Sequence, residues 1–269
     1  QPKGKSKEES MKKFLLLVIA VAVCCPLFAQ GGGEVSDLER VQSRGTLIVG
    51  ITDFAPMDYK DDSGSWIGFD ADMANAFVQS IGVEAVFIEI DWDNKLTELN
   101  TKNIDCIWNG MTLDEGVLAS METSKAYMNN AQVVVVPNED ASRYMTLDSI
   151  KGLSFAAENG SAGAGQLADL GIEYIGMQTQ ADALLEVASG ASDACVIDLL
   201  MASAMIGEGT SYPGLSYTVK LNDEEYGVGF RKGSDLAARL NDFLASCYES
   251  GKTLEIASEY DVQEAVIPF

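Results

Sequence analysis

Short apolar runs alternate with amphipathic segments along most of the chain. Runs rich in Val, Ile, Leu and Phe predict buried strands at 47–51, 86–90, 105–108, 153–157, 174–177, 193–197 and 226–230. Between them, apolar residues spaced three or four apart predict helices at 69–81, 95–100, 115–122, 162–170, 181–189, 199–206, 236–248 and 254–260. Two successive series of strand, helix and strand indicate an α/β fold with two parallel-rich sheets.

Two segments show how the local pattern sets these boundaries. Phe69, Met73 and Phe77 recur every four residues and predict one apolar helix stripe, which Gly82 ends. By contrast, the β-branched run at 132–136 is closed by a proline, and we expect it to be an extended connector between two sheets.

The composition fits one large or two medium domains, with 47% apolar residues in 269. The formal net charge is −23, and residues 30–269 hold 13 basic and 39 acidic residues, about −26. This charge argues against nucleic acid and anionic membrane surfaces as partners, and mildly favours cationic ones. A solvated acidic surface that keeps an exported protein soluble explains the same charge.

The N-terminal segment resembles a secretory signal, predicted at 11–29 after an extension at 1–10. Two lysines are followed by an apolar stretch at 14–25, which is shorter than the roughly 20 residues of a spanning helix. Ala29 is one candidate for the last residue removed. Alternatively, Cys24 or Cys25 carries a lipid, and the segment 30–44 is a flexible linker. Either reading predicts a protein outside the cytoplasmic membrane.

Three cysteines remain after the predicted signal, and none belongs to a recognisable motif. Cys106, Cys195 and Cys247 are widely spaced and odd in number, so they predict neither a disulfide framework nor a metal site. Cys106 and Cys195 lie in apolar strands and are expected to be small buried hydrophobes.

Five segments occur in an order and spacing that carry a family resemblance. They read GTLIVGITD at 45–53, IGFDADMA at 67–74, NIDCIWNGMT at 103–112, SGASDACVID at 189–198 and GVGFRKG at 227–233. Together they resemble the extracellular solute-binding proteins of polar amino-acid ABC transporters, over 45–267. The resemblance implies a monomer that needs no cofactor or metal, binds a small amino-acid-like solute and delivers it to a membrane permease.

The same resemblance implies a two-lobed, Venus-flytrap type of fold joined by a two-strand hinge. The first lobe would comprise 45–136 and 226–269, and the second 137–225. The chain would cross between the lobes near 136–138 and 222–226, and these crossings would act as the hinge for closure.

The resemblance assigns the ligand's ammonium group to Asp198 and the carbonyl of Gly110. Asp198 ends an apolar strand, where a bare carboxylate is costly unless it is paired; the alternative is that it caps the following helix. Thr112 would offer a hydroxyl and an amide to the ligand's carboxylate, and Asn109 lies at the same strand tip, where open α/β sheets bind ligands. The alternative for this run is an ordinary polar turn.

Other predicted contacts come from a turn and from aromatic residues. Ser161 and Ala162 begin a helix whose free amides would also face the carboxylate, although Ser161 read alone is a good helix cap. Phe54 and Trp92 match positions at which the family stacks aromatics on the ligand, unless they belong to the core. Asp53 would reach a polar ligand side chain, but the chain is one residue shorter here than many relatives.

The position that should hold the family's carboxylate-binding arginine is Val117. An arginine fork makes two charge-assisted hydrogen bonds to a carboxylate, and valine makes none. Asp114 and Glu115 add negative charge nearby. Three readings stay open: helix amides suffice for an amino acid, the ligand is a cationic amine without a carboxylate, or the pocket binds nothing. A lysine such as Lys125 could also swing in.

Catalysis has little support in the sequence. Some proteins of this fold are dehydratases of small carboxylic acids, but the chain has no histidine and no nucleophile–base pair in the predicted pocket. We therefore expect a non-enzyme. A module that feeds a membrane chemoreceptor would share every pocket residue.

Overall fold

The computed structural model describes residues 35–269. The predicted signal and the candidate lipidation sites Cys24 and Cys25 lie outside the described residues. The compact unit considered below is Ser36–Phe269. Within the described range, no helix has the length and apolarity needed to cross a membrane.

Part of the predicted linker is a helix that belongs to the folded unit, which corrects the expectation for 37–44. Helix α2 spans Asp37–Arg44, and the Ser36 hydroxyl caps it by accepting a hydrogen bond from the amide of Glu39 at 3.2 Å. Val41 is fully buried beneath it. Asp37 pairs with Arg231 at 3.0 Å, so the helix is tied to the far end of the chain.

The first sheet has the strand order β4-β1-β5-β13-β6, with β7 pairing to β13 as well. Strands β1, β4 and β5 run parallel, whereas β13 is antiparallel to β5. The strands span Thr46–Ile51 (β1), Glu84–Glu89 (β4), Cys106–Thr112 (β5), Glu122–Thr123 (β6), Met128–Asn130 (β7) and Glu224–Phe230 (β13).

The second sheet has the order β10-β9-β11-β8-β12. Its strands span Gln132–Pro137 (β8), Phe155–Glu158 (β9), Tyr174–Met177 (β10), Ala194–Asp198 (β11) and Leu215–Lys220 (β12). The expectation that 132–136 is a connector is wrong, because β8 pairs with β11 on one side and β12 on the other. Its apolar run is continuous because both faces of this strand are buried.

The chain passes between the two sheets twice. The first passage lies at Ala131, between β7 and β8, so the predicted crossing at 136–138 is wrong: it falls at the far end of β8. The second passage lies between β12 and β13, next to the predicted 222–226. The two passages are joined, since the Gln132 amide donates to the Asn222 side chain at 2.7 Å and the Leu221 amide to the Gln132 carbonyl at 2.8 Å.

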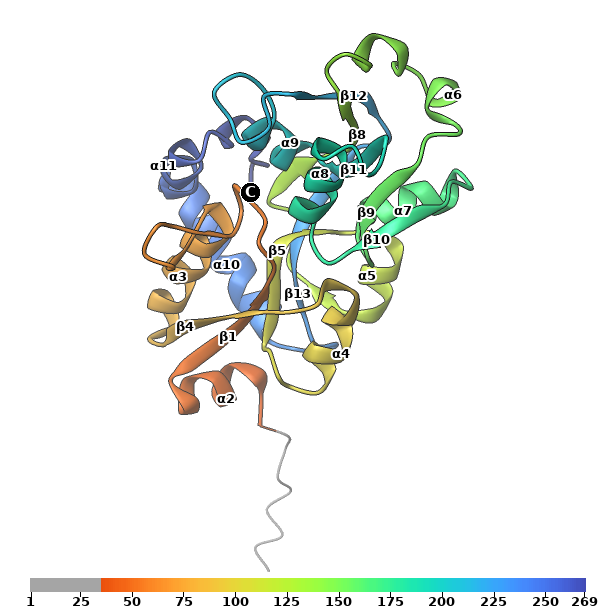
Figure 1. Ribbon diagram of the computed structural model, residues 1–269. Helices are drawn as coiled ribbons and strands as arrows, with labels where there is room; N and C mark the ends of the chain where they lie inside the picture. Colours follow the sequence, from red (N-terminus) through yellow and green to blue (C-terminus); the bar gives the residue numbers. More distant parts are fainter. Residues whose placement is uncertain (1–34) are drawn as a thin grey trace, which may run out of the picture. The chain divides into compact units, whose positions relative to one another are not determined.

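Helices flank both sheets and match most of the predicted stripes (Figure 1). Helices α3, α10 and α11 pack against one another beside the first sheet. The helices span Phe69–Ile81 (α3), Lys95–Asn100 (α4), Glu115–Ser120 (α5), Leu147–Ile150 (α6), Ala162–Asp169 (α7), Gln180–Ala188 (α8), Leu199–Met205 (α9), Leu236–Glu249 (α10) and Lys252–Glu259 (α11). Short 3-10 turns occur at Trp92–Asn94, Ala141–Arg143 and Gln263–Ala265, and β2 (Tyr59–Lys60) pairs with β3 (Trp66–Ile67).

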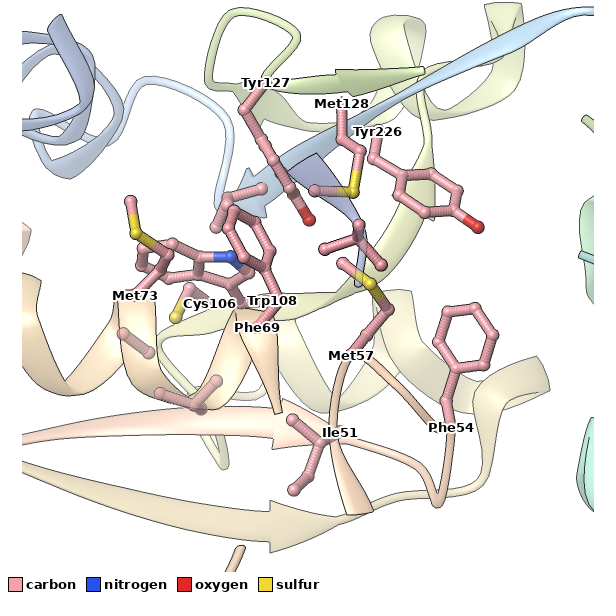
Figure 2. Close-up of a cluster of buried hydrophobic side chains, with 14 of the residues drawn as sticks. Ile51, Phe54, Met57, Phe69, Met73, Cys106, Trp108, Tyr127, Met128 and Tyr226 are labelled. Atoms are coloured by element: carbon pink, nitrogen blue, oxygen red, sulfur yellow. The ribbon is translucent and has the colours of Figure 1, made fainter. Parts of the chain in front are cut away.

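The aromatic core extends from α3 to the passage between the sheets (Figure 2). Phe69 stacks on Tyr127 with ring centroids 6.1 Å apart, and Phe54 meets Tyr226 edge to face at 6.4 Å. These rings are almost completely buried. The core of the first sheet therefore fixes Phe54, which lines the cavity described next, and Tyr226, whose hydroxyl reaches Asp198 in its wall.

Candidate functional site

A cavity of about 250 Å³ is lined by residues that follow the strand ends of both sheets. Every predicted ligand-binding residue except Asp53 lines this cavity. The first sheet and its helices contribute Phe54, Trp92, Asn109, Gly110, Thr112 and Val117, and the second contributes Ser161, Ala162 and Asp198. The fold therefore brings together residues that are more than 140 positions apart in the sequence, Phe54 and Asp198 for example.

The Asp198 carboxylate accepts four hydrogen bonds at the cavity wall. The residue ends β11 and is 4% exposed. Its Oδ1 accepts from the Tyr226 hydroxyl at 2.5 Å, from Gln132 Nε2 at 3.0 Å and from the Asn130 amide, and its Oδ2 accepts from Gln180 Nε2. Every one of these donors is neutral. The carboxylate is therefore fixed in orientation while its charge is left without a counter-ion.

Asp198 does not cap the helix that follows it. The amide of Leu199 donates to the Ala131 carbonyl at 2.8 Å, and the amide of Leu200 donates to Asn130 Oδ1 at 3.2 Å. Burial and the negative charge of Glu224 raise the pKa of Asp198 to about 8, against the opposing effect of its hydroxyl and amide donors. A cation placed beside Asp198 would lower that pKa again.

In the middle of β5, Asn109 positions its neighbours. Its Oδ1 accepts from the amide and hydroxyl of Thr52 at 3.0 and 2.8 Å, and its Nδ2 donates to the Thr52 carbonyl and to Asp58 Oδ2 at 3.1 and 2.8 Å. With these polar atoms engaged, the side chain ties β5 to the loop after β1. The next residue, Gly110, donates its amide to Asp70 Oδ2 at 2.7 Å.

Gly110 has to be a glycine. Its φ is +53°, and a Cβ there would lie 2.3 Å from Cε1 of Phe54. The Phe54 ring therefore rests directly on the backbone of β5. Further along the same strand, the Thr112 hydroxyl donates to Glu224 Oε1 at 3.1 Å, which connects the cavity to the second passage between the sheets.

On the other side of the cavity, α7 begins at Ala162 after the cap Ser161. The Ser161 hydroxyl accepts from the amide of Ala164 at 3.1 Å, as expected of a helix cap. Ser161 and Ala162 line the cavity at the positive end of the helix dipole. The capping role and an anion-binding role are therefore compatible at this turn.

Val117 is an apolar wall residue, 7% exposed, packed with Leu96 and Met121. Its amide donates to the carboxylate of Asp114, which caps α5, at 2.7 Å. Lys125, the lysine considered as a substitute for the absent arginine, is not among the cavity-lining residues, and its Nζ lies 5.7 Å from the ring centroid of Phe269.

The basic residue in the cavity wall is instead Lys95, which the sequence pattern did not indicate. Its Nζ donates to the carbonyls of Gly160 and Trp92 at 2.9 and 3.2 Å and lies 4.8 Å from the centroid of the Trp92 ring. It is the only basic side chain among the cavity-lining residues in the described part of the chain. The one available signal was its place two residues after the Asp-Trp-Asp segment.

Glu158 is the second residue that the sequence pattern did not indicate. It ends β9, lines the cavity and is only 3% exposed, and its Oε1 has no hydrogen-bond partner in the described structure. Burial and the charge of Asp198 raise its pKa to about 8. The cavity wall thus holds Asp93, Asp114, Glu158 and Asp198 against a single lysine.

Asp53 is the exception among the predicted site residues. It does not line this cavity but a second hollow of about 730 Å³, together with Tyr59, Lys60 and Leu200. The loop after β1 therefore places Phe54 at the cavity and leaves the neighbouring Asp53 outside it.

Two sheets joined by a double passage, with a cavity at their strand ends, define a two-lobed binding protein of the periplasmic type. The sequence model of the bacterial extracellular solute-binding proteins, family 3, matches residues 47–263, and the chain belongs to this family. The predicted fold class and family are therefore confirmed.

Individual relatives cover nearly the whole chain. The L-cystine-binding protein TcyJ of Escherichia coli is 26% identical over 253 residues, which cover 92% of this chain and 94% of the relative. A substrate-binding protein of an ABC uptake transporter from Streptococcus pneumoniae, with bound histidine, has a TM-score of 0.80 at 28% identity, covering 87% of this chain and 99% of that one. The ancestral amino acid-binding protein AncCDT-1, a precursor of cyclohexadienyl dehydratase, has a TM-score of 0.78 at 25% identity, covering 84% and 99%.

Proposed function

We propose that the cavity captures an amino acid or a close analogue, and that Asp198 receives its ammonium group. The observation that carries this proposal is the set of neutral donors around Asp198, which hold a buried carboxylate at the cavity wall without neutralising it. In the empty protein burial favours the protonated form of Asp198, and a ligand's ammonium group beside it would stabilise the ionised form. The carbonyl of Gly110, at the opposite wall, is the second acceptor for the ammonium group.

The opposite end of the solute would face Lys95, the amide of Ala162 at the start of α7, and Thr112. Lys95 already lies 2.9 Å from the carbonyl of Gly160, beside the turn that begins α7, so its ammonium and the helix amides can share one carboxylate. Phe54 and Trp92 would border the solute's side chain, with Val117 as part of the apolar wall. In this arrangement Lys95 supplies the positive charge that valine at position 117 cannot.

Closure would accompany binding, because each end of the solute contacts residues from both sheets. The lobes would meet where Lys95 donates to Gly160 and where Gly160 packs against Asp93. A solute that makes its full set of contacts only in this state shifts the population towards it. We place the first lobe at about 45–130 and 224–269 and the second at 132–220, with the two passages between the sheets as the hinge.

The closed, loaded protein would deliver its solute to the permease of an ABC transporter outside the cytoplasmic membrane. Its relatives are binding proteins, which supports a role without catalysis. The excess of carboxylates in the cavity favours one alternative ligand, a cationic amine that lacks a carboxylate. A chemoreceptor in place of the permease is a second alternative, with the same cavity chemistry.

A thermal-shift screen of residues 35–269 against the twenty amino acids, polyamines and quaternary amines tests this proposal. We expect an amino acid to raise the melting temperature and the matching amine without a carboxylate to have a smaller effect. Stabilisation by amines alone would favour the alternative ligand class. If chromatography detected conversion of any stabilising compound into a product, the non-catalytic role would be contradicted.

A further inference from the structure

Glu224 accepts hydrogen bonds from every strand that meets at the hinge. It begins β13, where the chain returns from the second sheet to the first. Its Oε1 accepts from the hydroxyl of Thr112 at 3.1 Å, and its Oε2 accepts from Asn222 Nδ2 at 2.9 Å. Oε1 also accepts from Asn130 Nδ2 at 2.6 Å and from Gln132 Nε2 at 2.8 Å. One carboxylate therefore connects β5 with both passages between the sheets.

Two of these amides also join Glu224 to Asp198. Asn130 Nδ2 and Gln132 Nε2 both donate to Asp198 Oδ1, the second at 3.0 Å. An amide nitrogen carries two hydrogens, so each of these nitrogens can serve both carboxylates at once. The orientation of the Asn130 amide is fixed, because its Oδ1 accepts from the backbone amide of Leu200 at 3.2 Å. The two carboxylates are thus held next to each other across the hinge.

No basic side chain of residues 35–269 pairs with either carboxyl group. Lys220, the lysine nearest to Glu224 in the sequence, bonds to Asp223 instead, and Lys95 in the cavity wall donates to backbone carbonyls. The other titratable groups that face the pair are Glu158 on β9 and Tyr226 on β13, next to Asp198, and Asp114, Asp223 and Glu225, which line a hollow with Glu224. Two adjacent carboxyl groups with little solvent around them are stable when they share one proton. Burial and the negative charge of Glu224 accordingly raise the pKa of Asp198 to about 8.

The two carboxyl groups face different spaces. Asp198 is almost fully buried at the wall of the 250 Å³ binding cavity, whereas the half-buried Glu224 lines a separate hollow of about 540 Å³. A solute that fills the cavity covers Asp198 and leaves Glu224 open to the hollow. A proton displaced from the pair can therefore reach solvent through Glu224 while the solute stays in place.

We infer that Glu224 is a positioning residue that shares one proton with Asp198 in the empty protein, and that the solute's ammonium group displaces this proton on binding. This inference rests on the proposed function, because it assumes that Asp198 receives the ammonium group. One proton passes from the pair to water, and the ammonium group takes its place as the donor to Asp198. The proton competes with the solute in acid, so affinity falls as the pH drops below about 8, the pKa of Asp198 in the empty protein.

Isothermal titration calorimetry in two buffers of different ionisation enthalpy counts the protons released on binding. The probe is the amino acid that stabilises the protein most in the thermal-shift screen, with histidine and cysteine set aside because their side chains titrate in the same range. We expect wild-type protein to release about one proton at pH 7, and to bind roughly 10-fold or more tightly at pH 8 than at pH 6. Glu224→Gln keeps the shape and removes the charge, so its affinity should change about threefold or less over this range, with less than half the proton release.

The next residue of β13 provides a matched control. Glu225 is exposed, so Glu225→Gln removes the same charge from the same hollow and should keep the wild-type proton release and pH dependence. A measurement without ligand supports the calorimetry. Because the raised pKa of Asp198 makes the empty protein less stable as the pH rises from 5 to 8, this fall should be smaller in Glu224→Gln than in wild type.

The outcomes distinguish this inference from the proposed function. Wild-type protein that binds an amino acid without releasing a proton overturns the inference and leaves amino-acid capture intact, and this result needs no variant to fold. An equal loss of affinity at pH 6 and pH 8 in Glu224→Gln, with unchanged proton release, has the same consequence. Loss of proton release in Glu158→Gln but not in Glu224→Gln would assign the proton to Glu158 and also overturn the inference. Binding of no amino acid overturns both.

Discussion

Two buried aspartates, one in each sheet, show how the same side chain serves structure in one place and binding in another. Asp105 accepts from the amide of Ile48 at 2.9 Å and is surrounded by Arg40, Arg44 and Arg231. Asp198 is buried to a similar extent, but neutral amides and a phenol surround it. Arginines of the same fold neutralise Asp105, whereas the neutral donors orient Asp198 and leave it available to a cationic ligand.

The two aspartates differ in the charge of their hydrogen-bond donors and hardly in their burial, so the neutral donors are what distinguish the binding residue. Asp105 immediately precedes the buried strand β5 and Asp198 ends the buried strand β11, so the sequence pattern alone treats them alike. What separates them is the long-range arrangement: arginines from α2 and from the end of β13 reach Asp105, whereas Asn130, Gln132 and Gln180 reach Asp198.

Removing the charge of Asp105 should mainly lower the stability of the fold, and removing that of Asp198 should mainly weaken ligand binding. Asp105→Asn removes the buried carboxylate that Arg40, Arg44 and Arg231 share, although Arg231 keeps its pairing with Asp37, and we expect the free energy of unfolding to fall by about 3–5 kcal/mol. Asp198→Asn removes a charge with no buried counter-ion, so stability should hold or rise while the affinity for a zwitterionic solute falls about 10- to 100-fold. Urea denaturation and calorimetry measure the two quantities. A large loss of stability in Asp198→Asn would contradict the comparison.

The pH dependence of stability tests the uncompensated carboxylates directly. Glu158 has a pKa of about 8 in the folded protein against an ordinary value of 4.5. At a pH between these two values, the folded protein therefore holds a proton that the unfolded chain has lost. Stability of the empty protein should therefore fall as pH rises from about 5 to about 8. Glu158→Gln should reduce that fall by up to about 3 kcal/mol.

Denaturation curves at pH 5 and pH 8 give the measurement. Asp198 contributes to the same trend, because its pKa is raised as well, so the variant should keep part of the slope. Glu173→Gln, which removes an exposed carboxylate, is the matched control. A slope identical in wild type and Glu158→Gln would show that Glu158 is ionised and paired in the empty protein.

Moving the cavity's positive charge from residue 95 to residue 117 tests whether ligand binding depends on where that charge lies or only on its presence. Lys95→Met should weaken binding of a carboxylate-bearing solute about 10- to 100-fold, since the charge-assisted hydrogen bond is lost. Adding Val117→Arg to this variant should restore much of the affinity, because arginine there would point a bidentate donor at the same anion. Lys125→Met, outside the cavity, should change nothing. Unchanged binding in Lys95→Met would mean that the helix amides hold the carboxylate alone.

Most of the fold was readable from the sequence because each sheet is built from local patterns. The helix stripe that begins at Phe69 and the apolar runs of β1, β5, β9 and β11 all appear where periodicity predicts them. The failures concern non-local pairing. β8 reads as a connector because a run of Val residues does not reveal which strands lie beside it, and α2 reads as linker because its partner Arg231 is distant in sequence.

The residues of the site also divide into those that the sequence predicts and those that it does not. Resemblance placed Asp198, Gly110 and Ser161 at the cavity, since these follow recognisable strand ends. Lys95 and Glu158 were not predicted, because no pattern marks them and their importance comes from what surrounds them in three dimensions. Asp53 does not line the cavity, because the loop after β1 places Phe54 there and leaves Asp53 in a second hollow beside Tyr59 and Lys60.

Gly160 offers the sharpest test of closure, because its backbone in the second lobe packs against Asp93 in the first. Its φ is +70°, and a Cβ there would lie 2.7 Å from Oδ1 and 2.9 Å from Cα of Asp93. The second of these contacts is to backbone and cannot be relieved by a rotamer change. Gly160→Ala should therefore hold the lobes apart and weaken binding by about tenfold, the equivalent of about 1.4 kcal/mol.

A matched glycine separates closure from local strain. Gly152→Ala also places alanine at positive φ (+94°) in the second half of the protein, but its Cβ would meet no atom within 4 Å. Both variants should lose similar stability through backbone strain, so only the difference between them reports on the lobe contact. Small-angle scattering with saturating solute should show wild type and Gly152→Ala contracting on binding. If Gly160→Ala contracts equally, the contact between Asp93 and Gly160 is not what limits closure.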